Sequence, residues 1–149
     1  MDILSGKTAV VTGAASGIGA ALSSALSDQG MHVVMADIEE RALDCAVAEL
    51  RSRHADVIGV LTNVMSDESD KDLERVATNR FGAIHLLCNN AGIASSSGHL
   101  GMLIWEQSLE DWAWALGVNF YGVLRGLRAF VPSKIAHGQK GTGHSLGYG

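Results

Sequence analysis

The sequence predicts an α/β protein built around a doubly wound parallel sheet. Two observations lead to this fold class: four short apolar runs alternate with amphipathic helical patterns, and a glycine-rich turn joins the first run directly to the first helical pattern. At 149 residues with 47% hydrophobic composition, the chain is long enough for one compact domain and too short for two. We expect that domain to cover residues 1–135, followed by a glycine-rich, flexible tail over 136–149.

The four apolar runs have the character of strands that are buried on both faces. They are rich in Val, Ile and Leu rather than alternating with polar residues, and they cover residues 8–12, 32–37, 57–62 and 84–89. A helical pattern separates each run from the next. Strands in this β-α-β-α-β-α-β order predict parallel pairing with right-handed crossovers.

Each of the three intervening helices is predicted from apolar residues that recur on one face. The first stripe consists of Ile18, Leu22, Ala25 and Leu26; the second of Leu43, Ala46, Val47 and Leu50; the third of Leu73, Val76, Ala77 and Phe81. These stripes are the faces that we expect to pack against the sheet.

A fourth, longer helix is predicted to begin at Ser108, whose hydroxyl can cap the first turn together with Asp111. We expect Pro132 to bend or end this helix, because proline has no N–H to donate within it. Its apolar stripe is predicted to be Trp112, Leu116, Phe120, Val123, Leu127 and Val131.

Composition and charge argue against several classes of protein. The 16 acidic residues outnumber the 11 basic ones, giving a net charge of -5, and no basic cluster suggests a nucleic-acid or membrane-surface partner. No apolar run has the length of a membrane span, and the first ten residues do not resemble a signal peptide. Cys45 and Cys88 are predicted to be buried thiols, and the six His residues show no metal-ligand spacing. We expect a cytoplasmic protein without a metal site.

The glycine-rich turn has the form of a phosphate-binding loop. Gly13, Ser16, Gly17, Ile18 and Gly19 follow the first predicted strand and open the first helix, where free backbone amides and the helix dipole attract a pyrophosphate. Three glycines allow the tight turn, the close approach of a phosphate and the packing of helix on strand. The alternative is that these glycines serve the turn alone.

Asp37 closes the second predicted strand, at the place where an acid can accept hydrogen bonds from the hydroxyls of an adenosine ribose. A carboxylate there would repel a 2′-phosphate, and neither Ser16 nor Ile38 offers a cation to receive one. We therefore expect NAD to be preferred over NADP. The alternative is that Asp37 merely caps the helix that begins near Glu39.

Two motifs together resemble the short-chain dehydrogenase/reductase family. The first is Thr12-Gly-x-x-x-Gly-x-Gly19, and the second is Asn89-Asn90-Ala91-Gly92 after the fourth apolar run. The resemblance covers about residues 3–135. It implies a Rossmann-type NAD(P)-binding domain with strand order 3-2-1-4, and an oxidoreductase that transfers hydride between the nicotinamide and an alcohol or carbonyl carbon.

The resemblance also implies roles for individual residues. Asn63 and Val64 stand where the family usually has Asp-Val beside the adenine. Asn90, Ala91 and Gly92 would support the central sheet and border the cofactor ribose. Asn119, on the predicted apolar face of the long helix, corresponds to the catalytic Asn that holds a water in the family's proton relay. A buried amide tied to neighbouring backbone is an alternative that is compatible with this role.

The family's Tyr-x-x-x-Lys pair and catalytic Ser have no counterpart in this chain. Tyr121 is followed four residues later by Arg125, and Tyr148 is followed only by Gly149. We therefore expect a truncated or frame-shifted product whose fold stops after the fourth sheet-flanking helix. If completed, it would act on a small-molecule alcohol or carbonyl compound. The family resemblance further implies a possible homo-oligomer through the helix over 108–131.

Two other functions remain open at this point. The first is a non-catalytic dinucleotide-binding or interaction module with the same fold. The second is a methyltransferase of related fold, which also places glycines after the first strand and an acid after the second. The Asn89–Gly92 segment weighs against the methyltransferase.

Overall fold

The computed structural model describes residues 3–94 and 103–136. Its elements in chain order are β1 Thr8–Thr12, α1 Gly17–Asp28, β2 His32–Asp37, α2 Glu40–Ser52, β3 Val57–Leu61, α3 Asp67–Phe81, β4 Leu86–Cys88, a 3₁₀ turn Ile104–Glu106, α4 Leu109–Leu116, a π-helical turn Gly117–Tyr121 and α5 Gly122–Ala136. Ala136 ends α5, and the rest of the predicted tail lies outside the described residues.

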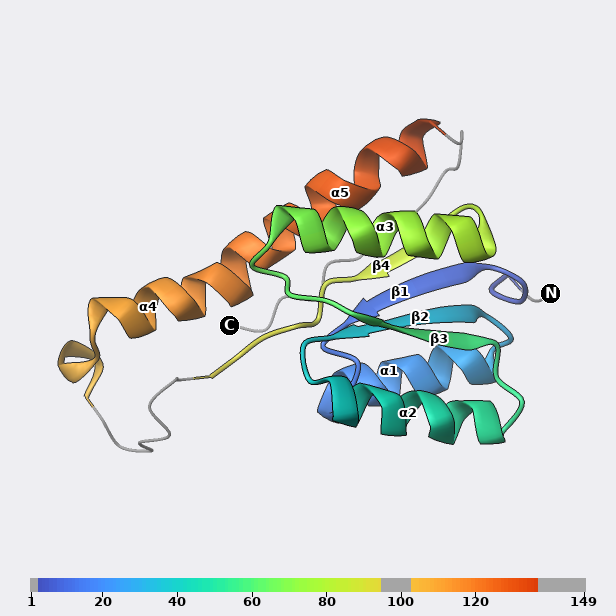
Figure 1. Ribbon diagram of the computed structural model, residues 1–149, viewed down its shortest axis with the longest axis horizontal. Coiled ribbons are helices and arrows are strands. Elements are labelled where there is room, and N and C mark those ends of the chain that lie inside the picture. The colour runs from blue at the N-terminus through green and yellow to red at the C-terminus, as the bar shows by residue number, and fades with distance from the viewer. Residues whose placement is uncertain (1–2, 95–102, 137–149) are drawn as a thin grey trace.

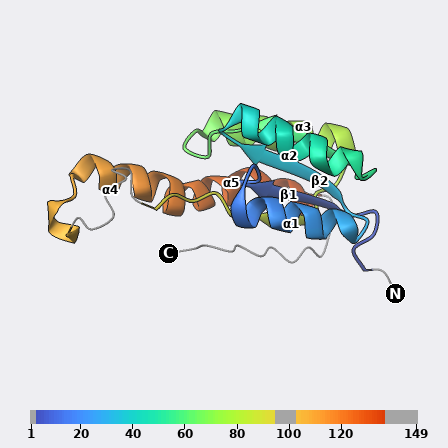
Figure 2. The same ribbon diagram turned by 90° about the horizontal axis from the view of Figure 1, so that it is seen from below.

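The four strands form one parallel sheet in the order β3-β2-β1-β4, which confirms the predicted fold and strand order. The central strand β1 pairs Val10 with Val34 of β2 on one side and with Leu87 of β4 on the other. All strands therefore end at the same edge of the sheet. α4 lies beyond that edge, and α5 leads back from it onto the sheet, as both views show (Figures 1 and 2).

β4 covers only Leu86–Cys88 of the predicted run over 84–89, and the side chain of His85 contacts β1 just before it. The backbone N–H of Thr8 donates to Nδ1 of the His85 ring at 3.1 Å, in place of a backbone carbonyl. The backbone N–H of His85 still donates to the oxygen of Thr8 at 2.9 Å, and the paired register with β1 begins at Leu86. The contact at Nδ1 holds His85 as a neutral acceptor, and burial, Lys7 and Lys134 lower its pKa.

Side chains of β1 and β2 alternate between the two faces of the sheet, which gives the domain two core layers. Helices α1 and α2 cover one face, and α3 and α5 cover the other (Figure 1). The first layer contains Ala9, Val11, Val33, Met35, Leu43 and Val47. The second contains Val10, Val34, Ala36, Leu73, Ala77 and Phe130. The predicted stripes of α2 and α3 are confirmed at Leu43, Val47, Leu50, Leu73 and Ala77.

The predicted stripe of α1 is only half right. Leu22 and Leu26 pack against the first core layer. Ile18 is 49% exposed and Ala25 is also exposed, whereas Gly19 and Ser23 are buried in their place. The smallest residues face the sheet because α1 begins in direct backbone contact with the loop after β1.

Of the two effects predicted for Pro132, ending the helix is wrong, because α5 continues through the proline to Ala136. The turn around the proline is anchored on both sides. Phe130 is 1% exposed within the second core layer, and Nζ of Lys134 donates to the backbone oxygen of His85 at 3.0 Å. These contacts compensate for the helical hydrogen bond that proline cannot make.

The predicted apolar stripe of this helix is also wrong. Trp112, Leu116, Phe120, Leu127 and Val131 are all 37% exposed or more. The buried face instead carries a four-residue spacing through Val118, Gly122, Gly126, Phe130 and Lys134.

That face packs closely because its glycines have no side chains, so the helix backbone contacts the side chains of neighbouring loops directly. A Cβ at Gly117 would lie 2.6 Å from Cε of Met65, and one at Gly122 would lie 3.1 Å from Cγ2 of Val64. A Cβ at Gly126 would overlap Oδ1 of Asn89. Apolar periodicity cannot detect a face that is built from glycine.

Cysteine burial is mixed. Cys88 is buried, as predicted, and burial raises its thiol pKa. Cys45 is exposed on α2, which contradicts the prediction. Within the described part of the chain, none of the helices combines the length and the apolar character that crossing a bilayer requires.

Candidate functional site

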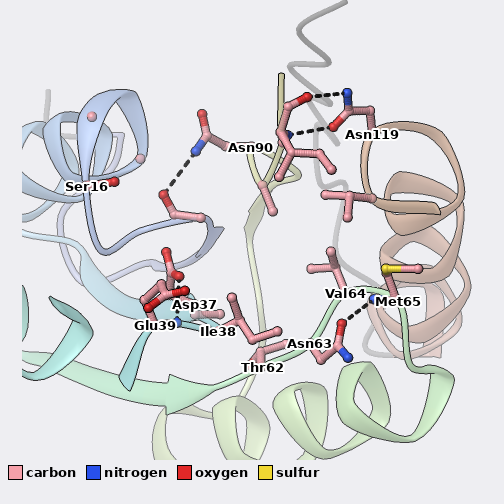
Figure 3. A pocket seen from close by; sticks show the side chains of 18 of the residues that line it. Ser16, Asp37, Ile38, Glu39, Thr62, Asn63, Val64, Met65, Asn90 and Asn119 are labelled. Atoms are coloured by element: carbon pink, nitrogen blue, oxygen red, sulfur yellow. Dashed lines mark hydrogen bonds between the residues drawn. The ribbon is translucent and has the colours of Figure 1, made fainter. Parts of the chain in front are cut away.

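A cavity of about 850 Å³ opens at the carboxyl ends of the strands. All thirteen residues that the sequence singled out line it: Gly13, Ser16, Gly17, Ile18, Gly19, Asp37, Ile38, Asn63, Val64, Asn90, Ala91, Gly92 and Asn119. Figure 3 shows the side chains converging from the loops after β1, β2, β3 and β4 and from the π turn. The structure therefore brings the predicted residues into one site.

The loop after β1 needs glycine for both conformation and space. Gly13 and Gly17 have positive φ values of 65° and 52°, which side chains rarely adopt. A Cβ at Gly19 would overlap the carbonyl oxygen of Gly13, and one at Gly13 would lie 2.8 Å from Cα of Ala91. Ser16 precedes α1 and its side chain makes no capping hydrogen bond, so its hydroxyl can meet a ligand at the helix N-terminus.

Thr12 and Asn90 tie the loops after β1 and β4 together. Oγ1 of Thr12 accepts from the N–H of Asn90 at 3.1 Å and from the N–H of Ala91 at 3.0 Å. Nδ2 of Asn90 donates back to the carbonyl oxygens of Thr12 at 3.0 Å and Gly13 at 3.3 Å. Thr12 is the first residue of the glycine motif, and its hydroxyl directly before the glycine turn is the signal that indicates this role.

Asp37 is held by two backbone amides from different loops. Oδ2 accepts from the N–H of Ala15 at 2.9 Å, and Oδ1 accepts from the N–H of Glu39 at 3.0 Å. The contact with Glu39 matches the proposed capping role, although α2 begins one residue later. Because both contacts fix the carboxylate at the cavity, capping and ligand binding are compatible. Glu39 also lines the cavity as a second acid, a position that no sequence motif indicated.

The wall after β3 is shaped by a local turn. Oδ1 of Asn63 accepts from the N–H of Met65 at 3.0 Å, and the N–H of Asn63 donates to Oγ of Ser69 at 2.9 Å. This leaves Asn63 exposed beside Ile38 and Val64 at one end of the cavity. Met65, which the sequence did not single out, lines the same wall and packs against Gly117.

Asn119 lies in the π turn, and its side chain forms two hydrogen bonds with the loop after β4. Its Oδ1 accepts from the N–H of Ile93 at 2.8 Å, and its Nδ2 donates to the carbonyl oxygen of Ile93 at 2.8 Å (Figure 3). The side chain is half-buried. Ile93 and Trp114 also line the cavity and were missed, because neither belongs to a recognisable motif.

Asp37 and Glu39 make one end of this site acidic. None of the described lining residues is Lys, Arg or His. Amides of the glycine loop and the positive end of α1 therefore supply the attraction for anions, while the two acids disfavour a further phosphate near them.

A family model described as short chain dehydrogenase matches residues 7–143. The chain belongs to this family. The match confirms the resemblance carried by the glycine turn and the Asn89–Gly92 segment, and it makes the protein a relative of oxidoreductases.

Three relatives illustrate the match. The 1-deoxy-11-beta-hydroxypentalenate dehydrogenase of Streptomyces avermitilis is 41% identical over 133 residues, which are 89% of this chain and 48% of that protein. The CLA biosynthesis dehydrogenase/reductase of Lactiplantibacillus plantarum is 33% identical over 129 residues, 87% of this chain and 43% of that protein. A short-chain dehydrogenase/reductase from Burkholderia phymatum, solved in complex with NAD, superposes with a TM-score of 0.89 at 40% identity over 95% of this chain and 49% of that one. The chain thus spans about half the length of the relatives it matches.

Proposed function

We propose that this chain binds NAD in the cavity at the strand ends, as the dinucleotide-binding part of an oxidoreductase. The observation that carries the proposal is the Asp37 carboxylate, which two backbone amides fix beside the glycine loop. The relative from Burkholderia phymatum was solved with NAD, which supports the same ligand here. NADP is the weaker candidate because Asp37 and Glu39 lie together at one end of the cavity.

The lining residues fit such a ligand from end to end. Free amides around Gly17 and Gly19 would hold the pyrophosphate at the N-terminus of α1. Asp37 would accept hydrogen bonds from the adenosine ribose, with Ile38, Asn63 and Val64 around the adenine. Asn90, Ala91 and Gly92 would border the second ribose. When bound, NAD supplies the hydride acceptor for oxidation of an alcohol or, as NADH, the donor for reduction of a carbonyl.

Asn119 is proposed as the catalytic Asn of the reaction. One N–H of its amide bonds to the Ile93 carbonyl, and the second can hold a water in a proton relay. Small-molecule alcohols or carbonyl compounds are the proposed substrates. The free thiols Cys45 and Cys88 support a cytoplasmic location, where thiols stay reduced.

A non-catalytic binding module is the second candidate. It is favoured by one observation: the groups that the described lining presents, the amides of the glycine loop and the Asp37 carboxylate, suit binding of a dinucleotide as such. NADH production from NAD with a panel of alcohols would support the enzyme, whereas NAD binding without turnover would support the module.

Titration calorimetry with NAD and NADP tests the proposal. Wild type is expected to bind NAD at least about tenfold more tightly than NADP, which corresponds to about 1.4 kcal/mol. Asp37→Asn keeps a neutral acceptor and removes the charge, so the preference for NAD should narrow several-fold. Asp44→Asn, on the exposed surface of α2, is the matched control and should leave the preference unchanged. Folded protein without affinity for either dinucleotide contradicts the proposal.

We further propose that the chain self-associates through the exposed side of α4 and α5. Leu116, Phe120, Leu127 and Val131 are each 37% exposed or more on that side, and exposed apolar patches of this kind mark protein contacts. Leu127→Glu is expected to weaken association at least about tenfold, because it places a charge within an apolar contact. Sedimentation over a concentration series measures this. Ile3→Glu, at a residue 66% exposed elsewhere, is the control; equal behaviour of both variants would count against this interface.

A further inference from the structure

Arg125, near the start of α5, makes three contacts: two with the π turn and one with α3. Its Nε lies 3.1 Å from Oδ1 of Asp67 on α3. Its Nη1 donates to the carbonyl oxygen of Gly117 at 3.4 Å, and its guanidinium lies 6.0 Å from the centre of the Tyr121 ring. Gly117 and Tyr121 are the first and last residues of the π turn. One side chain therefore contacts both ends of this turn and links it to α3.

The π turn sets the direction of Asn119. A π turn is one residue wider than an α-helical turn and is rare on its own. Each helical residue advances about 100° around the axis, so regular α-helix in its place would rotate Asn119 relative to α5. Its two hydrogen bonds to Ile93, both 2.8 Å, depend on the present direction. The wide turn thus needs support from outside the helix.

We propose that Arg125 is a positioning residue that holds the π turn open, so that Asn119 keeps Ile93 and the cavity wall in place. Its ion pair with Asp67 connects two side chains that are 27% and 55% exposed. Exposed pairs of this kind contribute little to global stability. Besides its charge effect on Asp70, we therefore expect Arg125 to act mainly on the turn and on Ile93.

Hydrogen exchange of the full chain, measured without ligand, tests this directly. The amide of Ile93 is protected through Oδ1 of Asn119. Arg125→Met keeps the apolar stem and removes the guanidinium, and it is expected to speed exchange at Ile93 by about tenfold. Amides of Val10 and Val34 in the central strands should not change. Asn119→Ala, which removes the acceptor, gives the upper limit of the effect.

Arg75→Met is the matched control, because Arg75 also pairs with an aspartate of α3, Asp72 at 2.9 Å, away from the turn. It should leave Ile93 unchanged. Unchanged exchange at Ile93 in folded Arg125→Met overturns the proposal. If Arg125→Met does not fold, Asp67→Asn decides instead: it removes the anchor of Arg125 and should speed exchange at Ile93 by about threefold, and no change there overturns the proposal.

A second readout rests on the proposed function. Arg125→Met should weaken NAD about tenfold and AMP less than about twofold, because AMP would occupy only the end near Asp37 and Asn63. Equal weakening of both ligands overturns a local role. Wild type that binds neither ligand contradicts NAD binding and leaves the exchange result standing, so the two failures are distinguishable.

Discussion

Gly19→Ala is expected to lower the affinity for NAD by about 100-fold. The added Cβ would overlap the carbonyl oxygen of Gly13 and lie 2.6 Å from Nδ2 of Asn90, so the loop and α1 must move apart. Forcing an atom into such packing costs about 1–3 kcal/mol, and each 1.4 kcal/mol is tenfold in affinity. The amides that would hold the pyrophosphate move with the loop. Titration calorimetry measures the loss.

Gly82→Ala is the control for this substitution. Gly82 also has a positive φ, of 76°, but a Cβ there would meet nothing within 4 Å, and the residue does not line the cavity. It should reduce stability by about 1 kcal/mol through backbone strain and leave NAD affinity unchanged. Wild-type affinity in Gly19→Ala would show that the glycine loop does not hold the dinucleotide.

Asp70→Asn is expected to stabilise the fold at pH 8 by about 2–4 kcal/mol and to have little effect at pH 4. Asp70 is 2% exposed on α3, and Oδ2 has no hydrogen-bond partner. Burial raises its pKa from 3.8 to about 7, with Arg125 opposing the rise and Asp67 adding to it. Each unit of that shift is worth about 1.36 kcal/mol between the two protonation states.

The direction of this pH dependence follows because the pKa of Asp70 is higher in the folded state than in the unfolded state. The fold favours the protonated carboxyl, so this stabilisation is complete below about pH 4 and is lost as the pH rises towards 7. Asparagine is neutral at every pH, so the Asp70→Asn variant does not lose stability as the pH rises towards 7. Urea unfolding at pH 4.5, 6 and 8 checks this, with Asp72→Asn, an exposed residue of the same helix, as the control. A gain that is the same at all three pH values would contradict the prediction.

Much of the sheet and of the site could be predicted because both depend on local patterns. Apolar runs mark strands buried on two faces, and the bounds of β1 and β2 agree with the structure. The loops after parallel strands meet at one edge, so motifs at strand ends had to converge. For this reason Gly13, Asp37 and Asn90 line one cavity although they are far apart in the sequence.

The long helix shows where such patterns fail. Its buried face contains Gly122 and Gly126, which an apolar period does not register, whereas the apolar side faces outward. No residue pattern predicted the π turn, although the Arg125 side chain, four residues beyond its last residue, contacts its first carbonyl. Ile93 was missed for the same reason, since its place in the cavity follows from its bonds to Asn119.

The bare helix face at Gly117 and Gly122 has a consequence for the width of the cavity. Met65 and Val64 line the cavity on one side and rest on these glycines on the other. The positions of Met65 and Val64 therefore depend on the absence of side chains at Gly117 and Gly122. A methyl group at Gly122 would press on Val64 from behind, so the size of the cavity can be changed at a position that does not line it.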